Sequence, residues 1–278
     1  MITLFDDPRL NLARGALGAV RIVHDPMLPP RVLRLVDAEG NEFFAKQHSE
    51  RDRYTRELHA YLAWGTHLIG HVPHVVSRQD ATCTLLLTAV PGVRADTVTP
   101  GSPEEEQAHY EAGRVLGKLH HATSAPRTGA MGTELAQRLH DWIARADRAG
   151  LISAVERGRL SHRADVLANT LMDSAVCHLD YQPRNWLLGE TFGLCDFEHM
   201  RRDARIRDFA RLEFRRWQAA PNLRTAFFAG YGQLLNDTEQ RLLESFGAIE
   251  AVTALVRGHE QDDLALSSHG RTVLARLA

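Results

Sequence analysis

The stretch H-L-D-Y-Q-P-R-N at residues 178–185, followed by D-F-E at residues 196–198, decides how this chain is interpreted. Asp180 supplies a carboxylate that can orient a hydroxyl group and accept its proton during phosphoryl transfer. Asn185 and Asp196 supply oxygen ligands of the kind that hold magnesium against phosphate groups. Aspartate and asparagine are also common turn residues, so this chemical interpretation depends on what the rest of the chain supplies.

The N-terminal part of the chain has the pattern of a small β-sheet with one helix. Strands are predicted at residues 19–24, 31–36, 42–47 and 82–90. A helix is predicted over residues 50–65, because its apolar residues recur on one helical face. The last strand ends at Pro91-Gly92, a strong turn signal that also suits a hinge. A boundary between two lobes is therefore predicted near residue 90.

Beyond this boundary the chain becomes mainly helical. Helical periodicity begins at residue 102 and recurs around residues 134–149, 151–172, 205–219 and 238–277. Short β-like pieces interrupt it at residues 175–179, 186–188 and 192–195. These pieces surround the irregular loop that carries Asp180 and Asn185, so the polar side chains lie between strands rather than on a helix.

The motifs resemble those of the protein-kinase-like superfamily, with H-x-D-x-x-x-x-N as the catalytic loop and D-F-E in place of D-F-G. Only eleven residues separate Asp196 from Asp208, which leaves no room for the long segment with which protein kinases hold a peptide. Gln182 occupies a position at which serine/threonine kinases have lysine. Together with the hinge at Pro91-Gly92, these features make the chain similar to the aminoglycoside phosphotransferase family of antibiotic and metabolite kinases.

This resemblance implies the fold. It is an α+β, bilobal, protein-kinase-like fold with a small β-rich N-terminal lobe and a larger, mainly helical C-terminal lobe. Residues 1–90 would form the nucleotide-binding lobe, and residues 91–278 the catalytic and substrate-binding lobe. The nucleotide would lie in the cleft.

The resemblance also implies which residues bind the nucleotide, ATP or GTP. Lys46 ends the third predicted strand and would contact the α- and β-phosphates. Glu57 follows eleven residues later on the predicted helix and would pair with Lys46. Thr88 and Val90 lie in the hinge run, whose backbone groups would face the purine. Each of these residues has an ordinary alternative role, as a surface charge or a strand residue, but they occur in the family's order.

The remaining site residues implied by the resemblance lie in the two motifs. Asp180 would be the catalytic base, and Asn185 and Asp196 would bind Mg²⁺. His178 would brace the catalytic loop by hydrogen bonding, and Asp208 would hold the backbone of that loop. The last two residues support the chemistry without taking part in it.

One segment departs from the family pattern. Residues 24–30, H-D-P-M-L-P-P, lie between the first two strands, where a loop should cover the phosphates. The segment has no glycine and three prolines, and proline lacks the backbone N–H that such a loop offers to phosphate. The choice between ATP and GTP and the role of this loop therefore stay open.

Composition excludes several other classes of protein. The net charge of -2, with acidic and basic residues interspersed, provides no basic stripe for nucleic acid. The three cysteines lack C-x-x-C spacing, which favours a reducing cytoplasm. No apolar run approaches the ~20 residues that span a bilayer, and nothing indicates an obligate protein partner. The expected partner is a small-molecule hydroxyl substrate.

The sequence leaves three hypotheses for the ligand. An antibiotic, aminoglycoside-like or a related natural product, is the first hypothesis, and a metabolic alcohol resembling choline, homoserine or a sugar is the second. A catalytically silent kinase fold that binds a ligand is the third, favoured by the glycine-free loop. Cationic substrates require clustered carboxylates. The candidates are Glu198, Glu213, Glu260, Asp262 and Asp263, although a solvated acidic helix face is the more ordinary interpretation of the last three.

Overall fold

The computed structural model describes residues 7–277, without the side chains of residues 127 and 128. The chain divides into two compact units. The first unit comprises Met1–Glu104 and Pro183–Arg201, and the second comprises Glu105–Gln182 and Arg202–Ala278. The segment Pro183–Arg201 thus belongs to the N-terminal unit although it lies in the second half of the sequence.

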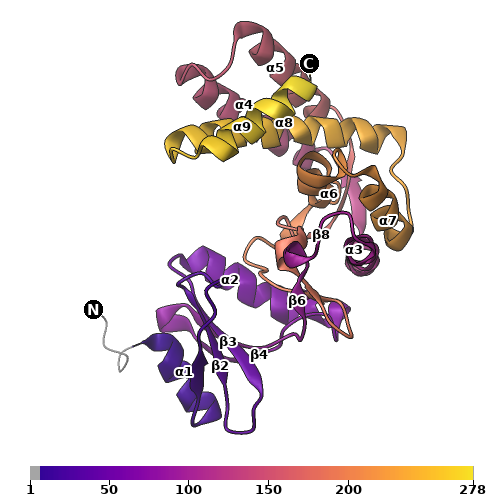
Figure 1. Cartoon of the computed structure of the whole chain (residues 1–278). Coiled ribbons are helices and arrows are strands. Elements are labelled where there is room, and N and C mark those ends of the chain that lie inside the picture. The colour runs from indigo at the N-terminus through magenta and orange to yellow at the C-terminus, as the bar shows by residue number, and fades with distance from the viewer. Residues whose placement is uncertain (1–6, 278) are drawn as a thin grey trace. The chain divides into compact units, whose positions relative to one another are not determined.

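The first unit is built on a five-stranded antiparallel sheet in the order β1-β2-β3-β5-β4 (Figure 1). Its strands are β1 (Arg21–Val23), β2 (Val32–Val36), β3 (Glu42–Gln47), β4 (Val75–Gln79) and β5 (Thr84–Thr88). The turn between β2 and β3 is closed by Asp37, whose carboxylate accepts a hydrogen bond from the backbone N–H of Asn41 at 2.8 Å. Strand β4 was not among the predicted strands.

Two helices accompany this sheet. Helix α2 (Arg51–His59) continues into a π-helical turn at Ala60–Trp64, within the helix predicted over residues 50–65. Helix α1 (Pro8–Leu17) was not predicted, and it buries Leu10 against sheet residues such as Leu35 and Phe43. The carboxylate of Asp7 accepts a hydrogen bond from the N–H of Arg9 at the start of α1. Proline at the first helical position also suits a helix start.

A small three-stranded sheet completes the first unit and places the D-F-E motif. It consists of β6 (Val93–Arg94), β9 (Trp186–Leu188) and β10 (Gly193–Leu194) in the order β10-β9-β6. At Gly92, φ is 144°, and an added Cβ would lie 2.8 Å from the backbone of Leu188. The turn after β5 therefore requires glycine, and it leads the chain directly into this sheet.

The second unit is mainly helical, which confirms the predicted α+β class. Its helices are α3 (Pro103–Ala122), α4 (Ala130–Arg148), α5 (Ala154–Ala168), α6 (Arg207–Leu212), α7 (Pro221–Tyr231), α8 (Asp237–Glu260) and α9 (Leu264–Arg276). Its strands are β7 (Ala125–Thr128), β8 (Met172–Cys177) and β11 (Arg201–Ala204). Helices α8 and α9 pack on each other, as do α4 and α5 (Figure 1). Among the described residues, no helix has the length and apolar character needed to cross a membrane.

The continuous helical periodicity predicted over residues 238–277 corresponds to two helices. The break falls at Asp262, whose φ of 53° is left-handed and ends helical geometry. Asp263 then caps α9, because its carboxylate accepts a hydrogen bond from the N–H of Leu266 at 2.9 Å. Short polar side chains favour such caps, and the apolar pattern on each side does not reveal the interruption.

Helices α3 and α7 approach each other through glycine. A Cβ added to Gly113 on α3 would lie 1.9 Å from the carbonyl oxygen of Phe227, and one added to Gly230 on α7 would lie 1.9 Å from that of Tyr110. Such distances are impossible for a real side chain, so backbone meets backbone at this crossing. The contact holds α7 against α3.

Replacing Gly113 by alanine is expected to destabilise the protein by about 1–3 kcal/mol, because helix α7 must shift to admit one methyl group. Gly158→Ala on α5 is the matched control, since no atom lies within 4 Å of its added Cβ. Alanine should stabilise that helix by about 0.5–1 kcal/mol. Urea unfolding of both variants measures the difference, and equal stability would contradict the close packing.

Candidate active site

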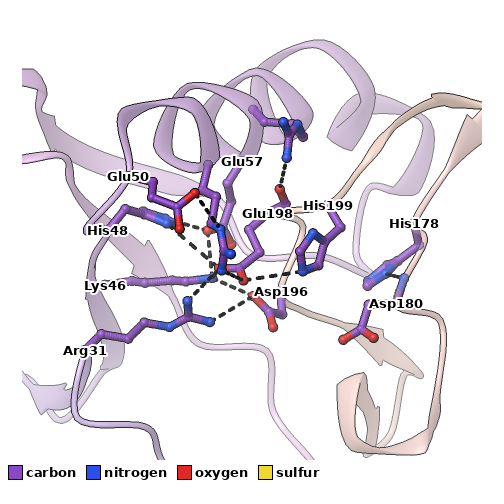
Figure 2. Close-up of polar contacts among 12 residues, drawn as sticks. Arg31, Lys46, His48, Glu50, Glu57, His178, Asp180, Asp196, Glu198 and His199 are labelled. Carbon is purple, nitrogen blue, oxygen red and sulfur yellow. Dashed lines mark hydrogen bonds and ion pairs between the residues drawn. The ribbon is translucent and has the colours of Figure 1, made fainter. Parts of the chain in front are cut away.

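A buried lysine in the first unit collects three carboxylates (Figure 2). The ammonium nitrogen of Lys46, on β3, lies 2.7 Å from Glu57 on α2, 2.5 Å from Asp196 and 3.2 Å from Glu198. Lys46 is 5% exposed. Asp196 and Glu198 follow β10, so a segment 150 residues away in sequence joins β3 and α2 at one cation. We call Lys46 and these three carboxylates the lysine cluster.

In the lysine cluster, each charged group stabilises the charged form of its neighbour. Burial by itself would lower the pKa of Lys46, but the carboxylates of Glu57, Asp196 and Glu198 outweigh it and raise that pKa above its ordinary value. Burial would likewise raise the pKa of Glu57, yet Lys46 and a hydrogen bond with His48 hold it below its ordinary value. Both members of the pair thus stay charged across the physiological range.

Glu198 is a second centre of charge that the sequence interpretation placed among possible substrate-binding acids. Its carboxylate is 4% exposed and lies 2.9 Å from Arg31 and 3.4 Å from Arg53, besides its contact with Lys46. Arg56 donates a hydrogen bond to its backbone oxygen at 3.1 Å. This carboxylate is therefore committed to cations within the first unit.

Asn185 and Asp196, the two predicted metal ligands, are brought together by the small sheet. The backbone N–H of Cys195 donates to the carbonyl oxygen of Asn185 at 3.1 Å, and Trp186 pairs with Leu194 in the ladder. Asp196 has a φ of 66°, a left-handed conformation that costs a non-glycine residue about 1–3 kcal/mol and is concentrated at functional sites. An amide oxygen and a carboxylate fit magnesium by donor type.

Of the two predicted hinge residues, Thr88 ends β5 and Val90 lies just beyond it. Thr88 donates its backbone N–H to the carbonyl oxygen of His74 at 2.9 Å, so that donor is used within the sheet. Within residues 7–277, no backbone hydrogen bond engages the N–H of Val90. The Val90 side chain packs against Gly193 of β10, which admits no Cβ there. Val90 thus joins the hinge to the strand that leads to Asp196.

In the second unit, Asp180 is 2% exposed and is held by two side chains. Gln182 donates its amide N–H to the Asp180 carboxylate at 2.6 Å, and Arg211 on α6 forms an ion pair with the same oxygen. The residue before it, Leu179, has a φ of 63°, which again marks a constrained loop. The ion pair with Arg211 was not predicted.

Asp208 fixes the backbone of this loop. Its carboxylate accepts hydrogen bonds from the N–H groups of His178 at 2.8 Å and Leu179 at 2.6 Å. It also lies 3.1 Å from Nε2 of His120, which is buried. The Nδ1 atom of His178 accepts the N–H of Asp180 at 3.3 Å (Figure 2). These are the supporting contacts that the family resemblance implied for His178 and Asp208.

Arg211, the partner of Asp180, belongs to a larger group of charged residues in the second unit. Burial lowers the pKa of the Arg211 guanidinium; Glu250 opposes this effect, and the charges of Arg215 and Arg257 add to it. Glu250 on α8 pairs with Arg215 at 2.6 Å and with His269 at 3.1 Å. Sequence periodicity could not reveal this group, because its members come from three helices.

Four of the five acidic residues that the sequence offered for a cationic substrate, all except the exposed Asp262, are engaged elsewhere in the described chain. Glu213 pairs with Arg224 at 3.0 Å, and Glu260 pairs with Arg145 at 2.6 Å. Asp263 caps α9, and Glu198 belongs to the lysine cluster. They are therefore not gathered into one carboxylate patch.

Replacing Lys46 by methionine is expected to destabilise the protein by about 3–5 kcal/mol, because it leaves buried carboxylates without their cation. Lys118→Met on α3 is the control, since Lys118 is exposed and surface changes are usually within about 0.5 kcal/mol. Denaturant unfolding compares the two variants. Similar unfolding midpoints would show that the cluster contributes little.

The lowered pKa of Glu250 predicts that the folded protein loses stability as the pH falls. Burial would raise its pKa, but hydrogen bonds from His269 and Arg215 bring it down to about 2. Because the folded pKa lies below the unfolded one, the stabilisation is complete above about pH 4.5 and is lost as the pH falls toward 2. Between pH 7 and 3.5, wild type should lose about 1 kcal/mol more than Glu250→Gln in urea unfolding.

The control for this prediction is Glu244→Gln on the same helix, whose side chain is 44% exposed and pairs with Arg163. This variant should lose stability with falling pH as the wild type does. If Glu250→Gln and the wild type lost the same amount, Glu250 would not be the group responsible.

Comparison with known proteins identifies relatives of the whole chain. The sequence pattern described as "Phosphotransferase enzyme family" matches residues 23–244. No curated protein matches. The solved structures that match include the gentamicin complex of APH(2")-IIa, with 14% identity, 99% of this chain and 97% of that chain covered, and a TM-score of 0.66.

Two further solved structures widen the range of acceptors among the relatives. Macrolide 2'-phosphotransferase type I is 17% identical, covers 100% of this chain and 98% of its own, and has a TM-score of 0.65. A choline/ethanolamine kinase family protein from Mesorhizobium loti is 17% identical, with 98% and 93% covered and a TM-score of 0.68. At these identities the likeness concerns the fold, which is that of kinase-like phosphotransferases.

Proposed function

Because this chain belongs to the phosphotransferase enzyme family, we propose that it transfers the γ-phosphoryl group of ATP or GTP to a hydroxyl group of a small molecule. The observation that carries the proposal is the lysine cluster. A buried Lys46 bound to both Glu57 and Asp196 is the arrangement that positions nucleotide phosphates beside a metal ligand. Residues 1–90 would supply nucleotide binding, with the hinge at Thr88 and Val90, and residues 91–278 catalysis and substrate binding.

In this mechanism the protein acts by positioning and by charge. Asp180 orients the acceptor hydroxyl and accepts its proton as the oxygen attacks the γ-phosphorus, while the bond from that phosphorus to the β-phosphate oxygen breaks and the nucleoside diphosphate leaves. Lys46 holds the phosphates, and Glu57 holds Lys46. Asn185 and Asp196 are the residues that would hold Mg²⁺, which when bound neutralises charge on the phosphates. Arg211 must share or release Asp180 when the acceptor hydroxyl takes its place.

An antibiotic or related natural product remains the first candidate acceptor, supported by the aminoglycoside and macrolide phosphotransferases among the similar structures. The charge pairs of the helical unit restrict this candidate. Arg211 is paired with Asp180, and Arg215 with Glu250. Glu213 and Glu260, two acids offered for a cationic substrate, are likewise paired with arginines, so they do not supply free carboxylates to a polycation. Among antibiotics, an acceptor with few positive charges therefore fits best.

The same pairing of acids with arginines suits a second candidate, a metabolic alcohol without multiple positive charges, such as a sugar or a homoserine-like amino acid. The choline/ethanolamine kinase family protein shares the fold as fully as the antibiotic kinases do. The cytoplasm is the proposed location, because all three cysteines are free thiols and nucleotide is available there. A screen of purified protein against aminoglycosides, macrolides, sugars, choline and homoserine, with nucleotide consumption as readout, separates the candidates.

Asp180→Asn is expected to lower kcat at least ~10²-fold, the lower end for loss of a positioned general base. Nucleotide affinity should be retained, because the residues that hold nucleotide lie in the first unit. The matched control is Asp141→Asn, an exposed aspartate on α4, which should leave kcat unchanged. Steady-state kinetics and calorimetric titration with nucleotide and magnesium measure the two properties.

Near-normal turnover of Asp180→Asn would contradict the assigned role. Binding of nucleotide without transfer to any acceptor in the screen would instead support a silent kinase fold.

A further inference from the structure

The segment between β1 and β2 cannot offer a row of backbone N–H groups to phosphate. Pro26, Pro29 and Pro30 have no N–H. The N–H of Met27 is donated to the Asp25 carboxylate at 3.0 Å, and that of Leu28 to the Asp25 carbonyl at 3.2 Å. The structure therefore supports what the sequence suggested: this loop has few backbone N–H donors left for phosphate, because prolines remove some and Asp25 accepts others.

Arg31 stands at the end of that loop and directs its side chain to the lysine cluster (Figure 2). Its guanidinium lies 2.9 Å from the Glu198 carboxylate and 4.0 Å from that of Asp196. Its carbonyl oxygen accepts the N–H of Gln47 at 3.0 Å, and the next residue, Val32, pairs with Lys46 across the sheet. The Arg31 side chain is thus anchored beside the lysine that is proposed to contact phosphate.

The exposure of Arg31 suits a ligand contact. Its side chain is 36% exposed, whereas Lys46 and Glu198 are nearly buried at 7% and 4%. Glu198 fixes one edge of the guanidinium, and the planar group has donors on other edges that can address an anion. Guanidinium groups bind phosphate oxygens through paired, charge-assisted hydrogen bonds. One arginine can therefore replace several backbone donors.

The charge around Arg31 also suits a polyanion. Arg31, Arg53 and Lys46 oppose the three carboxylates of the cluster, so the formal charges of the group balance. Without the two arginines the cluster would be net negative and would repel a triphosphate. Arg53 comes from α2 and contacts Glu198 at 3.4 Å, while Arg31 is the one that also approaches Asp196.

We propose that the Arg31 guanidinium binds a phosphate group of the nucleotide and takes the place of backbone donors in the proline-rich loop. This inference rests on the proposed function for the identity of the ligand. It deepens that function by assigning a phosphate-binding residue outside the kinase motifs. Binding releases no group and forms no covalent bond, and one guanidinium edge stays paired with Glu198.

Arg31→Gln is expected to raise the Kd of the triphosphate about 10- to 100-fold, the effect of losing charge-assisted hydrogen bonds. The Kd of the matching nucleoside should not change, because it has no phosphate. Calorimetry with magnesium and ATP, adenosine, GTP and guanosine gives these constants, and the tighter triphosphate is used for all variants. Arg31→Lys should recover part of the affinity, since lysine keeps the charge but loses the paired geometry.

Two control variants make the test specific. Arg21→Gln changes an exposed arginine on β1 and should alter neither constant. Arg53→Gln removes the other arginine that contacts Glu198, and it should weaken the triphosphate less than Arg31→Gln does. An equal effect of Arg53→Gln would overturn a direct contact, since release of Glu198 would then explain both results.

Unchanged triphosphate affinity in a folded Arg31→Gln variant, or equal weakening of triphosphate and nucleoside, would overturn the proposal. Thermal unfolding establishes that each variant is folded. Failure of the proposed function is distinguishable from both outcomes. If the wild type binds no nucleotide, the function and the Arg31 proposal fail together, whereas nucleotide binding weakened by Arg31→Gln without phosphoryl transfer contradicts only the enzymatic role.

Discussion

A single buried ammonium group organises the first unit. Lys46 connects the sheet, through Glu57, to α2 and, through Asp196 and Glu198, to the segment after β10. Removing charges from water is expensive, and the expense is offset only when each charge meets its partners in good geometry. The positions of the strand, the helix and the D-F-E segment are therefore linked, because the helix and the segment must each bring a charged group to Lys46 on the strand. This requirement also explains why the D-F-E segment shares one compact unit with β3 and α2, although Asp196 lies 150 residues after Lys46.

The same site shows what local sequence pattern can and cannot predict. The roles of Lys46 and Glu57 were expected from the resemblance to the kinase-like family, whose order of motifs they follow, and the adjacency of Asn185 and Asp196 follows from two short strands. Arg31 and Arg211 were missed, since an arginine at a loop end or on a helix usually faces solvent, and only tertiary packing directs it to an acid. Helix α1 was missed because only two of its residues are buried, so the apolar periodicity of its sequence is weak.

Backbone constraint accompanies the polar residues in both units. Leu179 and Asp196 have left-handed φ angles of 63° and 66° next to or at the proposed chemistry. In the second unit, Asp208 stabilises this conformation by accepting two backbone N–H groups of the loop. A sequence motif records which residues stand in such a loop, but the strain itself depends on φ and ψ. Preorganised geometry of this kind limits the motion needed when a substrate binds.

The interleaving of the two units has a consequence for synthesis of the chain on the ribosome. Residues 183–201 complete the first unit, although residues 105–182 of the second are made before them. Since Asp196 and Glu198 arrive with this late segment, the nascent N-terminal sheet holds Lys46 and Glu57 for a period without two of the acids that later neutralise the arginines around them. Domains generally fold as they emerge, but here neither unit can close before translation has passed well beyond the middle of the message. Partial N-terminal products should accordingly be natural clients of chaperones.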